Sequence, residues 1–211
     1  MTSSTTTNAE APAKKSVIPL ALTLFRLAMG PAIAALILWA ATRLHADPPL
    51  AGFIYALCVI LFALAAATDW LDGVLARKLN AVTPLGAALD HTADKVLITC
   101  VLLALAYASL TLELTAAAVI ILGRDVAIAG LREALGAQGR TLPVSTLGKW
   151  KAAGEMAGVG AYLAFQAAAL LGAGASVVIG LFWAARILLW AAALLALISG
   201  AHYVRALLRK A

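Results

Sequence analysis

Charged residues are scarce in this chain of 211 residues. Asp, Glu, Lys and Arg make up 12% of it, whereas hydrophobic residues make up 64%. That charged share is about half the share usual in soluble domains. The composition therefore excludes a disordered chain and an ordinary soluble enzyme, and it predicts an integral membrane protein.

Cysteine is also scarce, because only Cys58 and Cys100 are present and both lie inside apolar segments. Their number and spacing exclude a disulfide framework and a cysteine metal site, so we expect both to act as small hydrophobic residues. The formal net charge is +6, but the basic residues fall between apolar segments rather than on one amphipathic face. This distribution argues against a nucleic-acid partner.

Long stretches without any charge are the main positive feature. Twenty-one uncharged residues separate Asp47 from Asp69, and thirty separate Glu155 from Arg186. A membrane-spanning helix needs about 20 mostly apolar residues. The stretches are continuous and rich in Ala and Leu, whereas a transmembrane barrel would alternate polar and apolar residues. We therefore predict an all-α, polytopic membrane protein whose partner is the lipid bilayer.

Turn and breaker residues divide the chain into six predicted transmembrane helices. Residues 1–15 are rich in Thr, Ser and Ala and do not resemble a cleavable signal peptide. We expect them to form a mobile tail, and residues 16–211 to form one membrane domain. The predicted spans are Leu20–Thr42, Pro49–Arg77, Leu85–Ala108, Leu114–Leu135, Leu147–Leu171 and Ser176–Leu208.

The positions of Lys and Arg predict the orientation in the membrane. With the N-terminus inside, nearly all basic residues between spans face the cytoplasm, and only Arg43 lies clearly outside. This arrangement predicts the inner (cytoplasmic) membrane, with both termini facing the cytoplasm. The chain has no internal repeat, which weakens the interpretation as an inverted-repeat transporter.

Four of the ten acidic residues, Asp69, Asp72, Asp90 and Asp94, fall within twenty-six positions. On insertion scales each costs about 2.5–3.5 kcal/mol at a bilayer centre, so a compensating charge is needed. Helical spacing places each pair on one face of its helix, about 12 Å from the same cytoplasmic end. Carboxylates gathered there suit hard cations such as Mg²⁺ or Mn²⁺. The alternative is a set of salt bridges that hold the bundle together.

Residues beside these acids indicate phosphate chemistry. Gly73 and Gly86 have no side chain and would let a ligand approach the backbone, and Arg77 offers a planar guanidinium suited to phosphate. Carboxylates, two metal ions, glycines and an arginine together are typical of phosphoryl transfer, in which a carboxylate accepts the proton of the nucleophile. We therefore expect the active site here.

The stretch Asp-Trp-Leu-Asp-Gly-Val-Leu-Ala-Arg from Asp69, with Gly86, Asp90 and Asp94 after it, resembles the signature of the CDP-alcohol phosphotransferases. Every fixed position of that signature is present. The resemblance implies six transmembrane helices, a homodimer and a site that opens to the cytoplasm. It also implies that Asp69, Asp72, Asp90 and Asp94 hold two metal ions and that Asp94 is the general base. The CDP pocket would be formed by Asp69, Asp72, Gly73, Ala76, Arg77 and Gly86.

Other segments are similar to one branch of that family, the phosphatidylglycerophosphate synthases. They are residues 18–26, 123–125, 130–133, 143–145 and 148–151, and the first of them places Thr23 and Arg26 near the pocket. This similarity implies transfer of a phosphatidyl group from CDP-diacylglycerol to glycerol 3-phosphate, with release of CMP. The departures from the pattern are Leu20, His91, Ala152 and Glu155, none of which is a motif aspartate.

The predicted fourth and fifth helices carry cations near the same end. Arg124 and Arg132 share a helical face, and Lys149 and Lys151 begin the next helix. Such cations would attract a small phosphorylated alcohol. Other acceptors stay open, namely inositol phosphate, serine and phosphatidylglycerol, as does an ion-coupled transporter, since acids inside membranes often mark ion paths. Arg186 has no partner that the sequence identifies.

Overall fold

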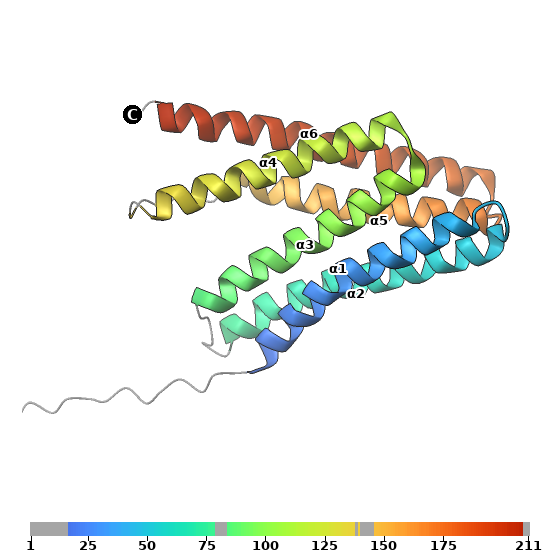
Figure 1. The fold of residues 1–211 in the computed structure, drawn as a ribbon, viewed down its shortest axis with the longest axis horizontal. Helices are drawn as coiled ribbons and strands as arrows, with labels where there is room; N and C mark the ends of the chain where they lie inside the picture. The colour runs from blue at the N-terminus through green and yellow to red at the C-terminus, as the bar shows by residue number, and fades with distance from the viewer. Residues whose placement is uncertain (1–16, 79–83, 138, 140–145, 209–211) are drawn as a thin grey trace, which may run out of the picture.

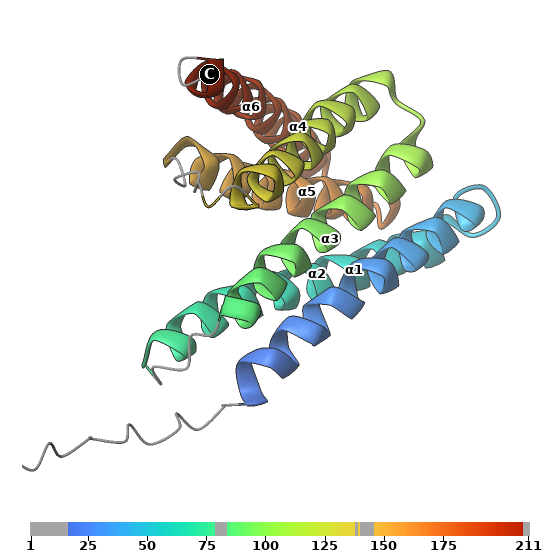
Figure 2. The same cartoon turned by 60° about the vertical axis from the view of Figure 1, so that its left-hand side comes forward.

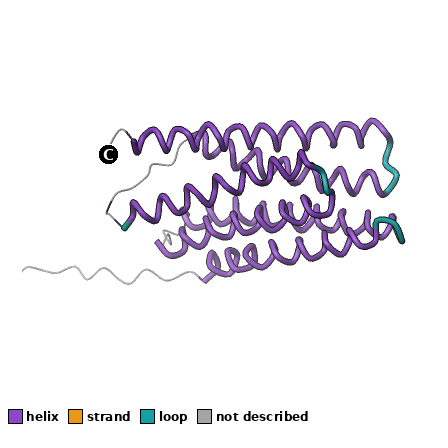
Figure 3. The backbone as a smooth tube through the Cα atoms, turned by 45° about the horizontal axis from the view of Figure 1, so that its top comes forward, coloured by secondary structure: helices purple, strands orange, loops and turns teal. Residues whose placement is uncertain are grey.

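The computed structural model describes residues 17–78, 84–137, 139 and 146–208, in which all regular structure is helical (Figure 3). Within these ranges, side chains are not described at 17–20, 69–78, 84–88, 90–91, 146, 204 and 206–208. The helices are α1 (Val17–Arg43), α2 (Pro48–Lys78), α3 (Pro84–Ser109), α4 (Leu112–Gly136), α5 (Thr146–Leu170) and α6 (Ala175–Leu208). Every predicted span lies within three residues of a helix at both ends. The predicted tail, residues 1–15, lies outside the described residues.

The six helices run alternately up and down one elongated bundle (Figure 1). As a result, the start of α1, the end of α2 and the start of α3 lie at the same end of the bundle as the end of α4, the start of α5 and the end of α6. We call this the motif end, because the aspartate motif lies on the parts of α2 and α3 that reach it. The opposite end is called the far end.

The bundle consists of two groups of three helices, which Figure 2 shows side by side. In the first group α1 packs against both α2 and α3, and in the second α6 packs against α4 and α5. Contacts of α2 with α5, and of α3 with α4 and α5, join the two groups. The two helices that carry the motif are therefore held by a common neighbour, α1.

Local sequence signals explain where α2 begins and where α5 ends. Asp47 caps α2, because its carboxylate accepts a hydrogen bond from the backbone N–H of Leu50 at 3.0 Å and Pro48 occupies the first helical position. After α5, Gly172 has a φ of +73°, a left-handed conformation that glycine adopts without strain. The N–H of Ala173 then bonds to the carbonyl of Ala168, which closes the helix end.

Small residues allow the helices to approach closely. A Cβ atom on Gly30 of α1 would lie 3.0 Å from the Cα of Leu97 and 3.1 Å from the carbonyl oxygen of Val96, both on α3. These are backbone atoms that cannot turn aside, so only glycine fits here. Close approach through small residues is the usual way in which membrane helices associate. It brings the motif-end halves of α1 and α3 into direct contact.

The apolar composition of the helices fits a multi-pass membrane protein. Among the described residues, α1, α2, α3, α4 and α6 each contain a stretch long and apolar enough to cross a bilayer. The helix α5 is less apolar because it carries Glu155 and Gln166, and it runs along the same bundle between α2 and α6. The protein is therefore an all-helical, polytopic membrane bundle, as the sequence predicted.

Candidate active site

The aspartate motif lies on the last turns of α2 and the first turns of α3, both at the motif end (Figure 1). Asp94 is the motif acid whose side chain the structure describes. The other predicted motif residues are helical, but their side chains lie outside the described set; they are Asp69, Asp72, Gly73, Ala76, Arg77, Gly86 and Asp90. Their predicted roles therefore remain predictions.

Asp94 forms an ion pair with Arg26, a residue of α1. The Nη1 of Arg26 donates a hydrogen bond of 2.7 Å to the Oδ1 of Asp94. The Arg26 side chain is completely buried, whereas 31% of the Asp94 side chain is exposed. Hydrogen bonds between charged groups are about twice as strong as neutral ones. The predicted base is thus oriented by a buried cation that the N-terminal pattern had placed near the pocket.

A cavity of about 330 Å³ opens beside Asp94. It lies between α3, α4, α5 and α6, so residues from both three-helix groups line it. Its volume is within the range of small-ligand sites, about 300–1,000 Å³. The lining residues are Asp94, Lys95, Ile98, Arg124, Asp125, Ile128, Arg132, Gly148, Lys151, Ala152, Glu155, Met156 and Tyr203.

The cavity brings together most of the residues predicted to bind the acceptor. Arg124, Arg132 and Lys151 line it together with Asp94. Lys149 is exposed and does not line the cavity. Thr23 is buried in α1 and is likewise outside the lining. A space shared by the predicted base and three predicted cations is a suitable place for a phosphorylated alcohol to meet a carboxylate.

Two of these cations are already neutralised by neighbouring acids. Asp125 accepts hydrogen bonds from Arg124 at 3.0 Å and from Lys151 at 2.5 Å. Lys151 also pairs with Glu155 at 2.6 Å, and both of these side chains are almost fully buried. The four-residue network of Arg124, Asp125, Lys151 and Glu155 therefore carries no net formal charge, although the sequence had suggested a cationic cluster.

The sequence interpretation missed the two acids of this network as parts of the site. Glu155 had been noted only as a departure from a pattern, yet its i,i+4 spacing from Lys151 was a usable signal. The contacts from α6 left no such signal: Ser199 accepts a hydrogen bond from Arg124 at 3.0 Å, and the Arg124 guanidinium lies over the ring of Tyr203 at 5.9 Å. They depend on how α6 packs against α4.

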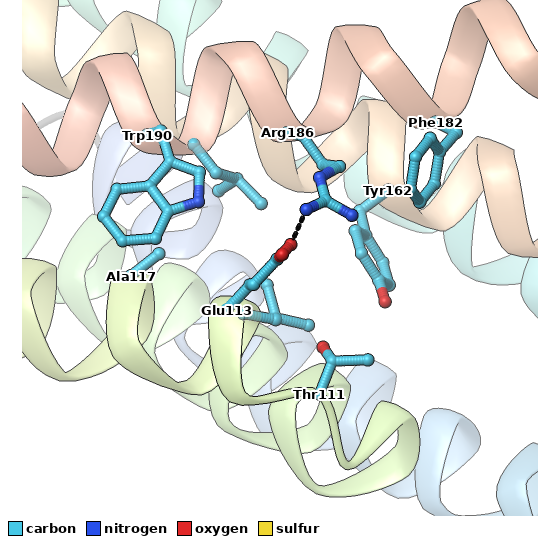
Figure 4. A pocket seen from close by; sticks show the side chains of 9 residues that line it. Thr111, Glu113, Ala117, Tyr162, Phe182, Arg186 and Trp190 are labelled. Atoms are coloured by element: carbon cyan, nitrogen blue, oxygen red, sulfur yellow. Dashed lines mark ion pairs between the residues drawn. The ribbon is translucent and has the colours of Figure 1, made fainter.

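Arg186, whose partner the sequence did not identify, pairs with Glu113 near the far end, so α6 is tied to the start of α4 (Figure 4). Its guanidinium also lies over the ring of Phe182 at 4.8 Å. The adjoining pocket has a volume of only about 50 Å³ and contains residues of α4, α5 and α6. This ion pair links α4 and α6 away from the cavity beside Asp94, so we expect it to have a structural role.

The residues suited to a metal ion are the motif carboxylates. The described side chains contain no group of three or more His, Cys, Asp or Glu that could hold a metal. Of the predicted ligands, Asp94 is the one whose side chain the structure describes, and its carboxylate is partly exposed and lines the cavity. Oxygen donors of this kind fit Mg²⁺ and Mn²⁺. Asp69, Asp72 and Asp90 belong to the turns of α2 and α3 at the same end.

Comparison with known proteins identifies the family. The model of the CDP-alcohol phosphatidyltransferase family matches residues 16–198, which is most of the chain. The chain belongs to this family. The match confirms the resemblance that the aspartate motif indicated.

Within the family, the chain is similar to proteins that are named for two reactions. The chain is 38% identical to a CDP-diacylglycerol–glycerol-3-phosphate 3-phosphatidyltransferase of Rickettsia bellii over 90% of this chain and 94% of the relative. It is 46% identical to a protein of the same name from Pseudomonas fluorescens over 43% of this chain and 46% of the relative. It is also 38% identical to a CMP-forming cardiolipin synthase of Oryza sativa subsp. japonica, over 46% of this chain and 33% of that protein.

Proposed function

We propose that this phosphatidyltransferase moves the phosphatidyl group of CDP-diacylglycerol to sn-glycerol 3-phosphate, giving phosphatidylglycerophosphate and CMP. The observation that carries the proposal is the cavity of about 330 Å³ that Asp94 shares with Arg124, Arg132 and Lys151. Relatives that span most of the chain are named for this reaction, which supports the same acceptor.

In the proposed reaction, a hydroxyl oxygen of the acceptor attacks the phosphorus that carries the diacylglycerol. A new P–O bond forms to the acceptor, and the P–O bond to CMP breaks. Asp94 accepts the hydroxyl proton, while Arg26 holds its carboxylate in place at 2.7 Å. Arg132 helps to orient the acceptor phosphate, because it lines the cavity that Asp94 faces. Fixing the two reactants in this way lowers the entropic part of the barrier.

The proposal includes two divalent ions, Mg²⁺ or Mn²⁺, held by Asp69, Asp72, Asp90 and Asp94. When bound, they would neutralise charge on the diphosphate and on the leaving CMP. Gly73, Ala76, Arg77 and Gly86 would line the pocket for CDP, as the family resemblance implies. Support comes from the oxygen donors of the motif and from their common position at the motif end of α2 and α3.

The purified protein, incubated with CDP-diacylglycerol and each candidate alcohol in turn, tests this function. We expect CMP release with glycerol 3-phosphate, and a lipid product whose mass matches phosphatidylglycerophosphate. Phosphatidylglycerol is the main rival acceptor, because a cardiolipin synthase is among the relatives. CMP release with phosphatidylglycerol, serine or inositol phosphate, and none with glycerol 3-phosphate, would contradict the proposal. Membership of a transferase family argues against the ion-coupled transporter.

We also propose that the motif end faces the cytoplasm of a cell with an inner membrane and that the protein is a homodimer. The bias of Lys and Arg toward this end supports the orientation. Single cysteines introduced at Arg43 and Arg205, which are exposed at opposite ends, should react with an impermeant thiol reagent from opposite sides of the membrane. Labelling of the Arg205 position from outside and of the Arg43 position from inside would contradict the proposed orientation. A monomeric mass in mild detergent would contradict the dimer.

A further inference from the structure

The cavity contains one more cation to which the sequence assigned no role in binding. Lys95 follows Asp94 directly in α3, and both side chains line the cavity. Lys95 is partly buried. Among the side chains that the structure describes, no carboxylate forms an ion pair with it. An ammonium group in a partly buried cavity beside the predicted base is placed to meet an anion.

Two other cations near Asp94, Arg26 and Lys151, form ion pairs with acidic side chains. Arg26 is completely buried and paired with Asp94, so it does not reach the cavity. Lys151 is held between Asp125 and Glu155, at 2.5 Å and 2.6 Å. A phosphate that approached Lys151 would also approach two carboxylates, and repulsion between like charges would oppose its binding. Lys151 is therefore poorly available to a dianion while Glu155 is charged.

The size of the acceptor is compatible with a contact to Lys95. In glycerol 3-phosphate, three carbons separate the reacting hydroxyl from the phosphate. If that hydroxyl lies at Asp94, the phosphate must lie within the same cavity, near the cations of α3 and α4. Lys95 from α3 and Arg132 from α4 both line this space. Two cations on different helices can bind a dianion from two sides.

We infer that Lys95 binds the phosphate of the acceptor alcohol, because Asp125 and Glu155 neutralise Arg124 and Lys151. This inference rests on the proposed function, in which the acceptor is phosphorylated and reacts at Asp94. In this arrangement, residues of α3 and α4 make the main contacts with the phosphate. The network of Arg124, Asp125, Lys151 and Glu155 lines the cavity without a net formal charge. Lys95 is then a residue that determines acceptor specificity.

Steady-state kinetics of Lys95→Met, Lys95→Arg and wild-type protein tests the inference. Loss of one hydrogen bond to a charged group costs about 1.5–3 kcal/mol, so Lys95→Met should raise the KM for glycerol 3-phosphate about 10- to 140-fold. The KM for CDP-diacylglycerol and the thermal midpoint should stay near the wild-type values. Lys95→Arg keeps the charge and should restore most of the affinity. A matched control is Arg205→Gln, an exposed cation at the motif end outside the cavity.

Glu155→Gln is a second variant for this test. If Lys95 had only a structural role, this substitution would not be expected to change the KM for glycerol 3-phosphate. Removing this carboxylate gives the network one net positive charge and makes Lys151 available to the acceptor. Glu155→Gln should therefore lower the KM for glycerol 3-phosphate and recover part of the affinity that Lys95→Met loses.

The two proposals fail in different ways. Wild-type protein that releases CMP with glycerol 3-phosphate, together with an unchanged KM in Lys95→Met, overturns the role of Lys95 and leaves the proposed function standing. Equal increases in the KM values for both substrates would also overturn it. Wild-type protein that is inactive with glycerol 3-phosphate overturns both.

Discussion

Arg26 of α1 and Asp94 of α3 are 68 residues apart in the chain, and their side chains form a hydrogen bond of 2.7 Å. The arginine is completely buried, so the pair fixes Asp94 from the protein side while the carboxylate stays accessible from the cavity. Gly30, one turn after Arg26, makes this contact possible because it lets α1 approach the backbone of α3.

Asp94→Asn should abolish turnover. The amide cannot accept the proton of the attacking hydroxyl, and general-base catalysis contributes about 10²- to 10⁴-fold. The measurement is CMP release, together with the affinity for CDP-diacylglycerol, which should largely survive. Asp47→Asn is a matched control, because it makes the same chemical change at the far end and Asn also caps helices well. Normal turnover in Asp94→Asn would remove Asp94 as the base.

Arg26→Met should destabilise the protein and impair catalysis together. The substitution leaves a carboxylate without its charged donor, which costs about 1.5–3 kcal/mol. We expect a lower thermal midpoint in detergent and a reduced kcat. Arg43→Met is the control, because Arg43 is exposed at the end of α1, where substitutions usually change stability by less than about 0.5 kcal/mol. An unchanged midpoint and kcat in Arg26→Met would show that the ion pair is dispensable.

Gly30→Ala should weaken the contact between α1 and α3. The added methyl group would lie 3.0 Å from the Cα of Leu97, which is backbone and cannot rotate away. Forcing an extra carbon into a well-packed interface typically costs about 1–3 kcal/mol. Thermal unfolding and CMP release should both show the loss.

Gly154→Ala is the matched substitution for this test. Its Cβ would lie 3.5 Å from the Cβ of Ala192, an ordinary contact, and alanine favours helix over glycine by up to about 1 kcal/mol. We therefore expect unchanged or higher stability. Equal losses in Gly30→Ala and Gly154→Ala would mean that the close approach at Gly30 has no special importance.

Removal of divalent cations should stop the reaction. We expect excess EDTA to eliminate CMP release and Mg²⁺ or Mn²⁺ to restore it, because the proposed mechanism needs positive charge beside the diphosphate. Ca²⁺ is an informative comparison, since its larger and more flexible coordination suits the reaction less well. Activity that persists in excess EDTA would contradict the metal site on the motif aspartates.

Loss of the ion pair between Glu113 and Arg186 should change stability but not substrate affinity. The pair connects α4 and α6 near the far end, away from the cavity beside Asp94 (Figure 4). A double-mutant cycle with Glu113→Gln and Arg186→Gln should give a coupling energy of about 0.5–1 kcal/mol. The KM values of both substrates should remain unchanged. A selective rise in either KM would show that the two ends of the bundle are coupled.

Much of the fold followed from features that are local in the chain. The lengths of the uncharged stretches and the breakers between them predicted six helices, because a bilayer accepts apolar segments of about 20 residues and penalises charges inside them. The spacing of Asp69, Asp72, Asp90 and Asp94 predicted an active site at one end of two successive helices. The family model confirmed the resemblance to the CDP-alcohol phosphotransferases that this motif indicated.

The sequence alone thus determined the membrane class, the helices and the end of the bundle where the motif lies, since each depends on neighbouring residues. Only the tertiary structure decided which charges pair: Arg26 with Asp94, Lys151 with Asp125 and Glu155, and Arg186 with Glu113. The physical reason is that these helices are apolar around most of their circumference. Their sequence pattern therefore does not fix which side faces which neighbour. Close packing through small residues determines how each helix is rotated about its axis. The rotations in turn determine that Lys95 and Lys151 line one cavity and that Lys151 is paired with acids there.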